Sequence, residues 1–227
     1  MKTHQSGFTL IEIAIVLVII GLLLGGVLKG QELITSARVR NLIAQQDGIK
    51  AAYFGFLDRY RALPGDYLAA SATANIKGVT AAPGDGDGQI ESGNESLAVW
   101  DQLGKAGFIN GAYTYVAGAA ISDANTLKNP YAGFLQLIYD NQYGDESGSN
   151  RHNLKTGNQV PVNILAEVDR KVDDGKPYTG AFQFSDYVGP VGTAPTVADC
   201  IVLGATPADA QWNVAMESNN CGGASIF

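Results

Sequence analysis

The sequence predicts an α+β fold in which a long N-terminal helix precedes a domain of short helices and strands. A run of apolar residues occupies positions 8–28, and apolar side chains continue beyond it at the spacing of a helix face. Short segments rich in aromatic and aliphatic residues, which are typical of strands, occur only later, at 112–116, 134–139 and 181–184. Helices and strands that occupy separate parts of a chain indicate the α+β class.

The apolar run contains one charged residue, Glu12. As a helix, its 21 residues would span about 31 Å, the thickness of the hydrocarbon core of a bilayer. A charge at the centre of a bilayer costs roughly 3 kcal/mol or more, so Glu12 needs a cationic partner. The nearest candidate is the α-amino group that a cut between Gly7 and Phe8 would create.

Two ordinary explanations of the run account for less. A secretory signal has an apolar stretch of about 7–15 residues and then a small-residue cleavage site, whereas this run is longer and residues 28–31 offer no such site. A plain single-pass anchor fits the length but leaves Glu12 unexplained. A cut in front of the run explains both the length and the carboxylate.

The sequence G-F-T-L-I-E at residues 7–12, followed by the apolar run, resembles the N-terminal signal of type IV pilins and type II secretion pseudopilins. The resemblance implies that a prepilin peptidase cuts after Gly7 and methylates the new N-terminal Phe8. It also implies that Glu12 pairs with the terminal amine of a neighbouring subunit in a filament.

The same resemblance implies a type IV pilin-like fold, in which the long helix packs on a small antiparallel β-sheet. The implied segments are a leader at 1–7, a transmembrane and filament-core helix at 8–28, an amphipathic continuation at 29–62, and a periplasmic or extracellular globular domain at 63–227. The N-terminus would stay cytoplasmic. This orientation rests on the resemblance, since cations beyond the run oppose the positive-inside rule; they are Lys29, Arg38 and Arg40.

The continuation of the helix has one apolar face, and Pro64 predicts its end. The face consists of Leu42, Ile49, Tyr53, Phe56 and Tyr60. A turn is predicted at 63–66 and is followed by a stretch of small residues without clear period at 69–82.

Two shorter helices are predicted in the domain. Ser92 and Glu95 have capping-box spacing in front of an apolar face that includes Trp100. A second helix is predicted at 162–172, and a polar, glycine-rich surface loop at 144–158. Parts of this region, including the L-P-G-D turn and the G-D-G-D-G loop, resemble a group of pilin-like proteins.

The chain is acidic, with a net charge of −7, and loss of Lys2 with the leader would lower it to −8. Binding to nucleic acid depends on Lys and Arg, so we expect no nucleic-acid partner.

Outside the cytoplasm the two cysteines, Cys200 and Cys221, are expected to be oxidised, and two cysteines allow a single intramolecular pairing. Closure of this loop is worth roughly 3 kcal/mol in the chain-entropy model. A disulfide loop near the C-terminus resembles the D-region of type IV pilins, and it can equally be a simple staple on a tail rich in loops.

The D-G-D-G segment allows two interpretations. Calcium takes 6–8 oxygen ligands, and Asp85 and Asp87 echo the middle of an EF-hand loop. The EF-hand pattern fails at both ends, where Pro83 and Asn94 stand in place of acids. A different calcium cage would add Asp66, Glu91 and Glu95. The alternative is a tight Asp-Gly turn without a metal.

Catalysis is not expected, and no cofactor other than calcium is considered. His152 lies in a polar segment without a nucleophile motif, and Asp173 and Asp174 are interpreted as a solvated helix end.

The function expected from these observations is that of a structural subunit of a type IV pilus or type II secretion pseudopilus. Its expected partners are other pilin or pseudopilin subunits, the prepilin peptidase and the inner-membrane assembly platform. We expect it first as a single-pass protein of the inner membrane and then in the filament. The alternatives are a minor pilin that binds a ligand in adhesion or DNA uptake, and an anchored periplasmic enzyme.

Overall fold

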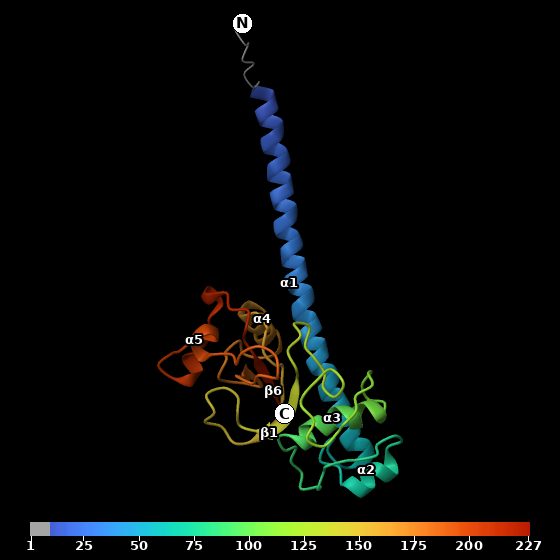
Figure 1. Ribbon diagram of the computed structural model, residues 1–227. Coiled ribbons are helices and arrows are strands. Elements are labelled where there is room, and N and C mark those ends of the chain that lie inside the picture. Colours follow the sequence, from blue (N-terminus) through green and yellow to red (C-terminus); the bar gives the residue numbers. More distant parts are fainter. Residues whose placement is uncertain (1–9) are drawn as a thin grey trace. The chain divides into compact units, whose positions relative to one another are not determined.

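The computed structural model describes residues 10–227, and α1 (Leu10–Tyr60) is its longest element (Figure 1). The chain divides into two compact units. One ends at Arg38, and the other runs from Val39 to Phe227. Helix α1 contributes to both units, with 51 residues and a length of about 76 Å.

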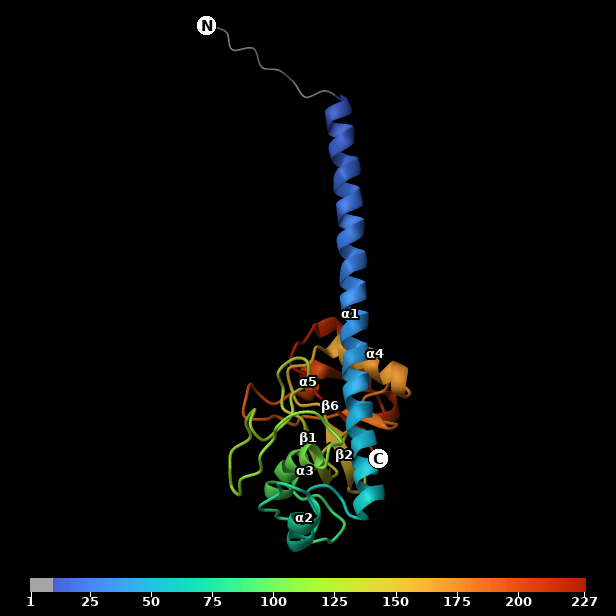
Figure 2. The same ribbon diagram turned by 90° about the vertical axis from the view of Figure 1, so that its right-hand side faces the viewer.

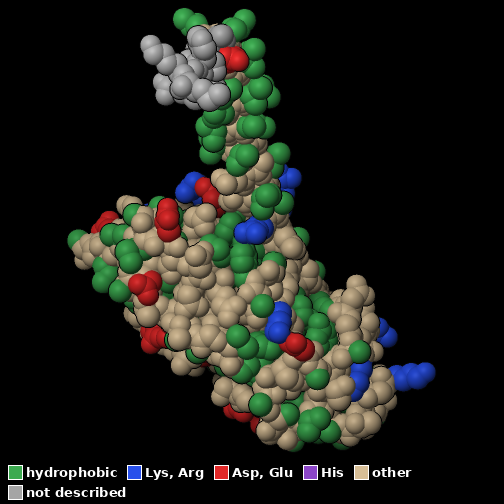
Figure 3. All heavy atoms as spheres, turned by 45° about the horizontal axis from the view of Figure 1, so that its top comes forward, with side chains coloured by type: hydrophobic (Ala, Val, Ile, Leu, Met, Phe, Trp, Pro, Cys, Tyr) green, Lys and Arg blue, Asp and Glu red, His purple; other side chains and the backbone are tan. Residues whose placement is uncertain are grey.

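In the first unit, the side chains of residues 10–29 are exposed. Hydrophobic side chains cover this part of the helix (Figure 3). Within the described residues, α1 is the one helix whose length and composition suit a membrane crossing.

In the second unit, one face of α1 is buried, and it includes Val39, Leu42, Ile49, Tyr53 and Phe56. The spacing predicted this face from Leu42 onward, with Tyr60 at its half-buried end, and Val39 extends it toward the N-terminus. The helix ends at Tyr60, two residues before the expected boundary.

The main sheet has four antiparallel strands in the order β1-β2-β6-β3. Their bounds are β1 Gln136–Asp140, β2 Arg151–Lys155, β6 Gly223–Ile226 and β3 Phe182–Phe184. The C-terminal strand β6 therefore lies between two strands that precede it in the chain. A second, two-stranded sheet pairs β4 (Ile201–Val202) with β5 (Gln211–Trp212).

Short helices surround the sheet. They are α2 (Ala69–Asn75), α3 (Asn94–Lys105), α4 (Val162–Val172), α5 (Val197–Cys200) and the 3₁₀ turns η1 (Pro207–Asp209) and η2 (Val214–Met216). Helices α2 and α3 lie beside the C-terminal end of α1 in both views (Figures 1 and 2).

Two apolar clusters hold α1 to the domain. Val39 and Leu42 pack with α4, β3 and the disulfide. Farther along the helix, Phe56 and its neighbours pack with α3 and with Leu137 and Leu154 of the sheet. The α+β fold, with a long helix on a small antiparallel sheet, is confirmed.

Helix α4 has the predicted bounds, and β3 was predicted within one residue. The segment predicted as a strand at 134–139 forms β1, displaced toward the C-terminus. The strand predicted at 112–116 was wrong. The N–H of Tyr115 donates to Asp101 Oδ1 at 3.0 Å, and its ring packs on α3. This segment is therefore held by contacts with the helix α3.

The capping box predicted from Ser92 and Glu95 was also wrong. The N-cap of α3 is Gly93, with φ of 86°, and Glu95 Oε2 accepts the N–H of Glu91 at 3.0 Å. The surface loop predicted at 144–158 was wrong in its second half, which forms β2. Leu154 and Lys155 of that strand are fully buried.

Candidate functional site

Of the three residues predicted as sites at the N-terminus, Glu12 is described by the structure. Gly7 and Phe8 lie outside the described residues. Glu12 lies in the first turn of α1 as described, on the exposed apolar helix of the first unit. Its neighbours Ile11 and Ile13 are 67% and 49% exposed. A carboxylate therefore stands in a helix surface that is otherwise apolar.

The two cysteines form a disulfide, Cys200–Cys221, and both are fully buried. Cys200 ends α5, and Cys221 exchanges two backbone hydrogen bonds with Val160. The disulfide thus joins the end of α5 to the C-terminal segment, and the hydrogen bonds with Val160 join that segment to the chain that leads into α4.

The acidic loop brings together three of the five carboxylates proposed as calcium ligands. Asp66, Asp85 and Asp87 each place one oxygen within 4.8 Å of the others. In the described residues, that group includes neither Glu91 nor Glu95.

The loop is held by two long-range hydrogen bonds to Asp66 and by two bonds of Asx type within the loop. Asp66 accepts the N–H groups of Gly86 and Gly88, at 2.7 and 2.9 Å. Asp85 accepts the N–H of Asp87 at 3.1 Å, and Asp87 accepts the N–H of Gln89 at 2.8 Å. These bonds fit the turn, and each carboxylate keeps lone pairs that a cation could use. Three carboxylates supply only part of a calcium shell, so backbone oxygens or water would have to complete it.

Burial and the repulsion of nearby carboxylates raise the pKa values of Asp66 and Glu95. For Asp66 the largest cause is burial, the two glycine N–H groups oppose it, and Asp87 and Asp85 add to it. The pKa of Glu95 is raised by burial and then by nearby carboxylates, including Asp66, against the N–H of Glu91. A bound cation would relieve this repulsion.

A second acidic group lies at the end of α4. Asp169 is fully buried and accepts the indole N–H of Trp212 at 2.7 Å and the N–H of Gly175 at 3.2 Å. Burial is the main cause that raises its pKa to about 7. Sequence reasoning missed this residue, because its partner is 43 positions away.

The other residues considered for catalysis, His152, Asp173 and Asp174, make contacts that support the fold. His152 stacks against Tyr53 and Tyr139, at 5.8 and 4.9 Å between ring centroids, and burial lowers its pKa. Asp173 accepts the N–H groups of Ala181 and Phe182. Asp174 accepts the N–H of Lys176 at 2.9 Å. Both acids therefore close the turn after α4.

Comparison with known protein families gives a match at the N-terminal end of the chain. Residues 2–28 match the family model described as the prokaryotic N-terminal methylation motif. No curated protein and no solved structure matches the chain. The matched segment includes the apolar helix as far as Leu28 and contains Glu12. The chain therefore carries the prepilin-type methylation signal of type IV pilins and pseudopilins.

Proposed function

We propose that this protein is a structural subunit of a type IV pilus or a type II secretion pseudopilus, cleaved and N-methylated before it assembles into a helical filament. The observation that carries the proposal is the coincidence of the methylation motif at 2–28 with a helix whose apolar surface is exposed over residues 10–29. Such a surface needs a bilayer or other helices to cover it.

Burial of this helix surface would hold the subunit first in the bilayer and then in the filament core. Apolar area removed from water contributes about 25 cal/mol per Å², and the bilayer supplies the same burial before extraction. In the filament, packing against neighbouring helices would replace the lipid. Glu12 would then set the axial register by pairing with the amine of Phe8 in the next subunit.

The glycines of the helix support close packing of neighbours. Gly21 and Gly25, and likewise Gly26 and Gly30, are four residues apart. A Cβ at any of them would meet no atom within 4 Å in the described residues, so packing within the chain does not require glycine there. Small residues at this spacing let helix backbones approach each other in a membrane or a filament core.

The implied route begins in the inner membrane, with the leader in the cytoplasm and the domain outside. A prepilin peptidase would cut after Gly7, and an assembly platform would extract the subunit. We propose a leader at 1–7, a filament-core helix at 8–28, its amphipathic continuation at 29–62 and a globular domain at 63–227. The role is structural rather than catalytic.

A second candidate role is that of a minor pilin that binds a ligand. It is favoured by one observation, a polar cavity of about 450 Å³ on the domain. The acidic charge of −7 favours a ligand other than nucleic acid.

The assembly proposal is tested at Glu12. Glu12→Ala removes the carboxylate together with its desolvation cost, so the subunit should be cleaved and inserted normally but should enter filaments poorly. Glu12→Gln should be intermediate, because it can accept a hydrogen bond but carries no charge. The matched control is Glu32→Ala, which removes an exposed carboxylate from the same helix, where it pairs with Lys29.

The measurement is the amount of subunit in sheared filaments or in overproduced pseudopili, relative to the amount in membranes. N-terminal sequencing should begin at a methylated Phe8 for every variant. Parental assembly of Glu12→Ala would contradict the proposal. An N-terminus at Met1, or one created after Leu28, would show that the signal is processed differently.

A further inference from the structure

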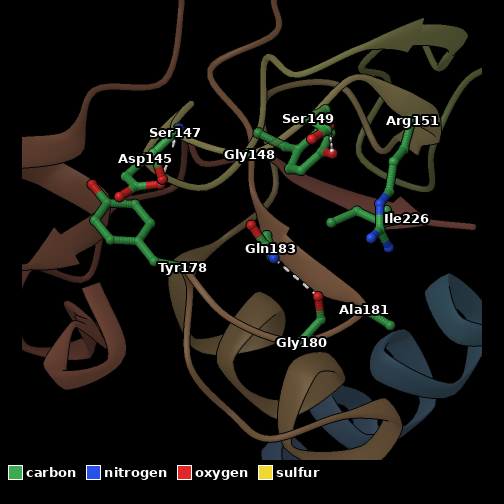
Figure 4. Close-up of a pocket in the computed structure, with 11 residues that line it drawn as sticks. Asp145, Ser147, Gly148, Ser149, Arg151, Tyr178, Gly180, Ala181, Gln183 and Ile226 are labelled. Carbon is green, nitrogen blue, oxygen red and sulfur yellow. Dashed lines mark hydrogen bonds between the residues drawn. The ribbon is translucent and has the colours of Figure 1, made fainter. Parts of the chain in front are cut away.

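A polar cavity of about 450 Å³ opens on the domain between two loops (Figure 4). One loop, which includes Asp145 and Ser149, connects β1 to β2. The other, which includes Tyr178 and Gly180, leads into β3. Arg151 and Ile226 come from the sheet itself. No residue of the disulfide loop lines the cavity among residues 10–227, so it is separate from the region bounded by the two cysteines.

The two ends of the cavity carry opposite charges. Figure 4 shows Asp145 and Tyr178 on one side, Arg151 on the other, and Gln183 between them. Arg151 is exposed and makes no ion pair within residues 10–227. The Ser147 hydroxyl donates to Asp145 Oδ1 at 2.7 Å and is the main cause that lowers the pKa of Asp145. Both ends are therefore charged at neutral pH.

The hydrogen bonds of the loops hold the cavity in shape. Tyr143 Oη donates to the carbonyl of Ser149 at 2.8 Å, and the N–H of Gly144 donates to the carbonyl of Phe184 at 2.8 Å. Gly144 has φ of 62°, and a Cβ there would lie 2.2 Å from Gln183 Oε1. The positive φ favours glycine at this point, where the loop between β1 and β2 approaches β3, and a larger residue would displace the Gln183 side chain. A site that is formed before the ligand arrives loses less entropy on binding.

We propose that this cavity binds an acidic saccharide, a sugar unit that carries a carboxylate. Arg151 would hold the carboxylate through its two-pronged guanidinium. Asp145 would accept hydrogen bonds from sugar hydroxyls at the opposite end, and the Gln183 amide would contact the ring between them. The half-buried ring of Tyr178 offers an apolar face to the C–H groups of the sugar.

Other ligand classes fit the same residues less well. A nucleic acid needs several cations, and the cavity is lined by one, Arg151. A free phosphate would meet Arg151, but it has no C–H face to place against the Tyr178 ring. A metal would find one carboxylate, which is fewer than a calcium or magnesium site uses. An acidic sugar offers a carboxylate to Arg151, hydroxyls to Asp145 and a C–H face to Tyr178.

The test is calorimetric titration of the full chain in a non-ionic detergent. The probe is digalacturonate, and the neutral digalactoside of the same linkage is the matched ligand, since the two differ only in the carboxylates. We expect digalacturonate to bind saturably and the digalactoside about tenfold more weakly or worse, because a charge-assisted contact is worth about a factor of ten. Inorganic phosphate should not compete at equal concentration.

Three variants locate the site. Arg151→Gln should weaken digalacturonate binding about tenfold, Arg151→Lys should restore part of it, and Asp145→Asn should weaken both sugars. Arg59→Gln, at an exposed arginine of α1 outside the cavity, should bind like the parent. An unchanged thermal midpoint in each variant shows that the fold is kept.

Undetectable digalacturonate binding, equal binding of both sugars, competition by phosphate at equal concentration, or full binding by Arg151→Gln would each overturn the proposal. The titration uses unassembled subunits, so its failure would leave the filament role intact, and failure of assembly would leave this site intact.

Discussion

The ammonium group of Lys155 lies 2.6 Å from Asp140 Oδ2, with the lysine side chain only 1% exposed and the aspartate side chain 17% exposed. The two residues come from neighbouring strands, β2 and β1. Asn153 donates to the other oxygen of Asp140 at 2.8 Å, and the Lys155 ammonium lies 5.8 Å from the centroid of the Tyr187 ring. A buried lysine is tolerated here because its charge is paired and the partner carboxylate is itself hydrogen-bonded.

Removing one partner should therefore destabilise the domain strongly. Asp140→Ala leaves the Lys155 ammonium buried without a counter-charge, and we expect the free energy of unfolding to fall by about 3–5 kcal/mol. Adding Lys155→Met should recover much of the loss, since no charge then remains buried. Urea unfolding of the full chain in detergent, followed by near-UV circular dichroism, measures both effects.

The control is the pair Lys128–Asp123, in which the aspartate is 76% exposed and the lysine 34% exposed. Asp123→Ala should cost less than about 1 kcal/mol. If Asp140→Ala costs no more than Asp123→Ala, the buried pair does not stabilise the sheet.

The pair also shows where sequence reasoning reached its limit. The helix face of α1 and the bounds of α4 follow from periodicity, because each element presents one apolar face to the core. Strand β2 does not follow from periodicity. Its residues Asn153 and Lys155 are polar but buried, and both bind Asp140 on the neighbouring strand β1. Strand β6 has small residues, Gly223 to Ser225, whose central place depends on long-range pairing.

The candidate sites divide in the same way. The N-terminal signal is continuous in sequence, so its motif was recognisable without a structure, and the family match at 2–28 agrees with it. The cavity was not recognisable, because Tyr178 is distant in sequence from Asp145 and Arg151 and no local pattern joins it to them. Asp66 was named from the sequence as a possible ligand, and the structure brings it to the D-G-D-G loop through its bond to Gly86, 20 residues away.

The disulfide should be present in the exported protein. Under non-reducing conditions, the intact mass should be two hydrogens lower than after reduction, and no thiol should react with an alkylating reagent in the folded chain. Replacing both Cys200 and Cys221 by serine should lower the free energy of unfolding by about 3 kcal/mol, since the bond closes a loop across 21 positions. Two alkylatable thiols in folded, exported protein would contradict this pairing.

The calcium proposal has a thermal test on the full chain in detergent. If Asp66, Asp85 and Asp87 hold the cation, a chelator should lower the thermal midpoint and added calcium should restore it. A ligand at 100 times its Kd stabilises the folded state by about 2.7 kcal/mol. Asp87→Asn should abolish the response, whereas Asp58→Asn, at an exposed residue outside the loop, should keep it. A midpoint that responds to neither chelator nor calcium would identify the loop as a plain turn.

The last prediction concerns the pH dependence of stability, through Asp169 and the indole of Trp212. The folded pKa of Asp169 is raised from 3.8 to about 7, chiefly by burial, and Asp174 and Asp173 add smaller contributions. Because the folded pKa is above the unfolded one, this group contributes most stability below about pH 4. That contribution is lost as the pH rises toward 7, and it amounts to roughly 4 kcal/mol in all.

Asp169→Asn should remove this dependence, since the amide oxygen can still accept the Trp212 N–H but carries no charge at any pH. Relative to the parent, the variant should therefore gain stability steadily between pH 4 and pH 8, and Trp212 fluorescence should report the change beside the buried group. Asp186→Asn, at an exposed acid, should run parallel to the parent over the same range. If the Asp169→Asn curve also runs parallel to the parent, the buried carboxylate is ionised across the range, and the N–H groups of Trp212 and Gly175 outweigh its burial.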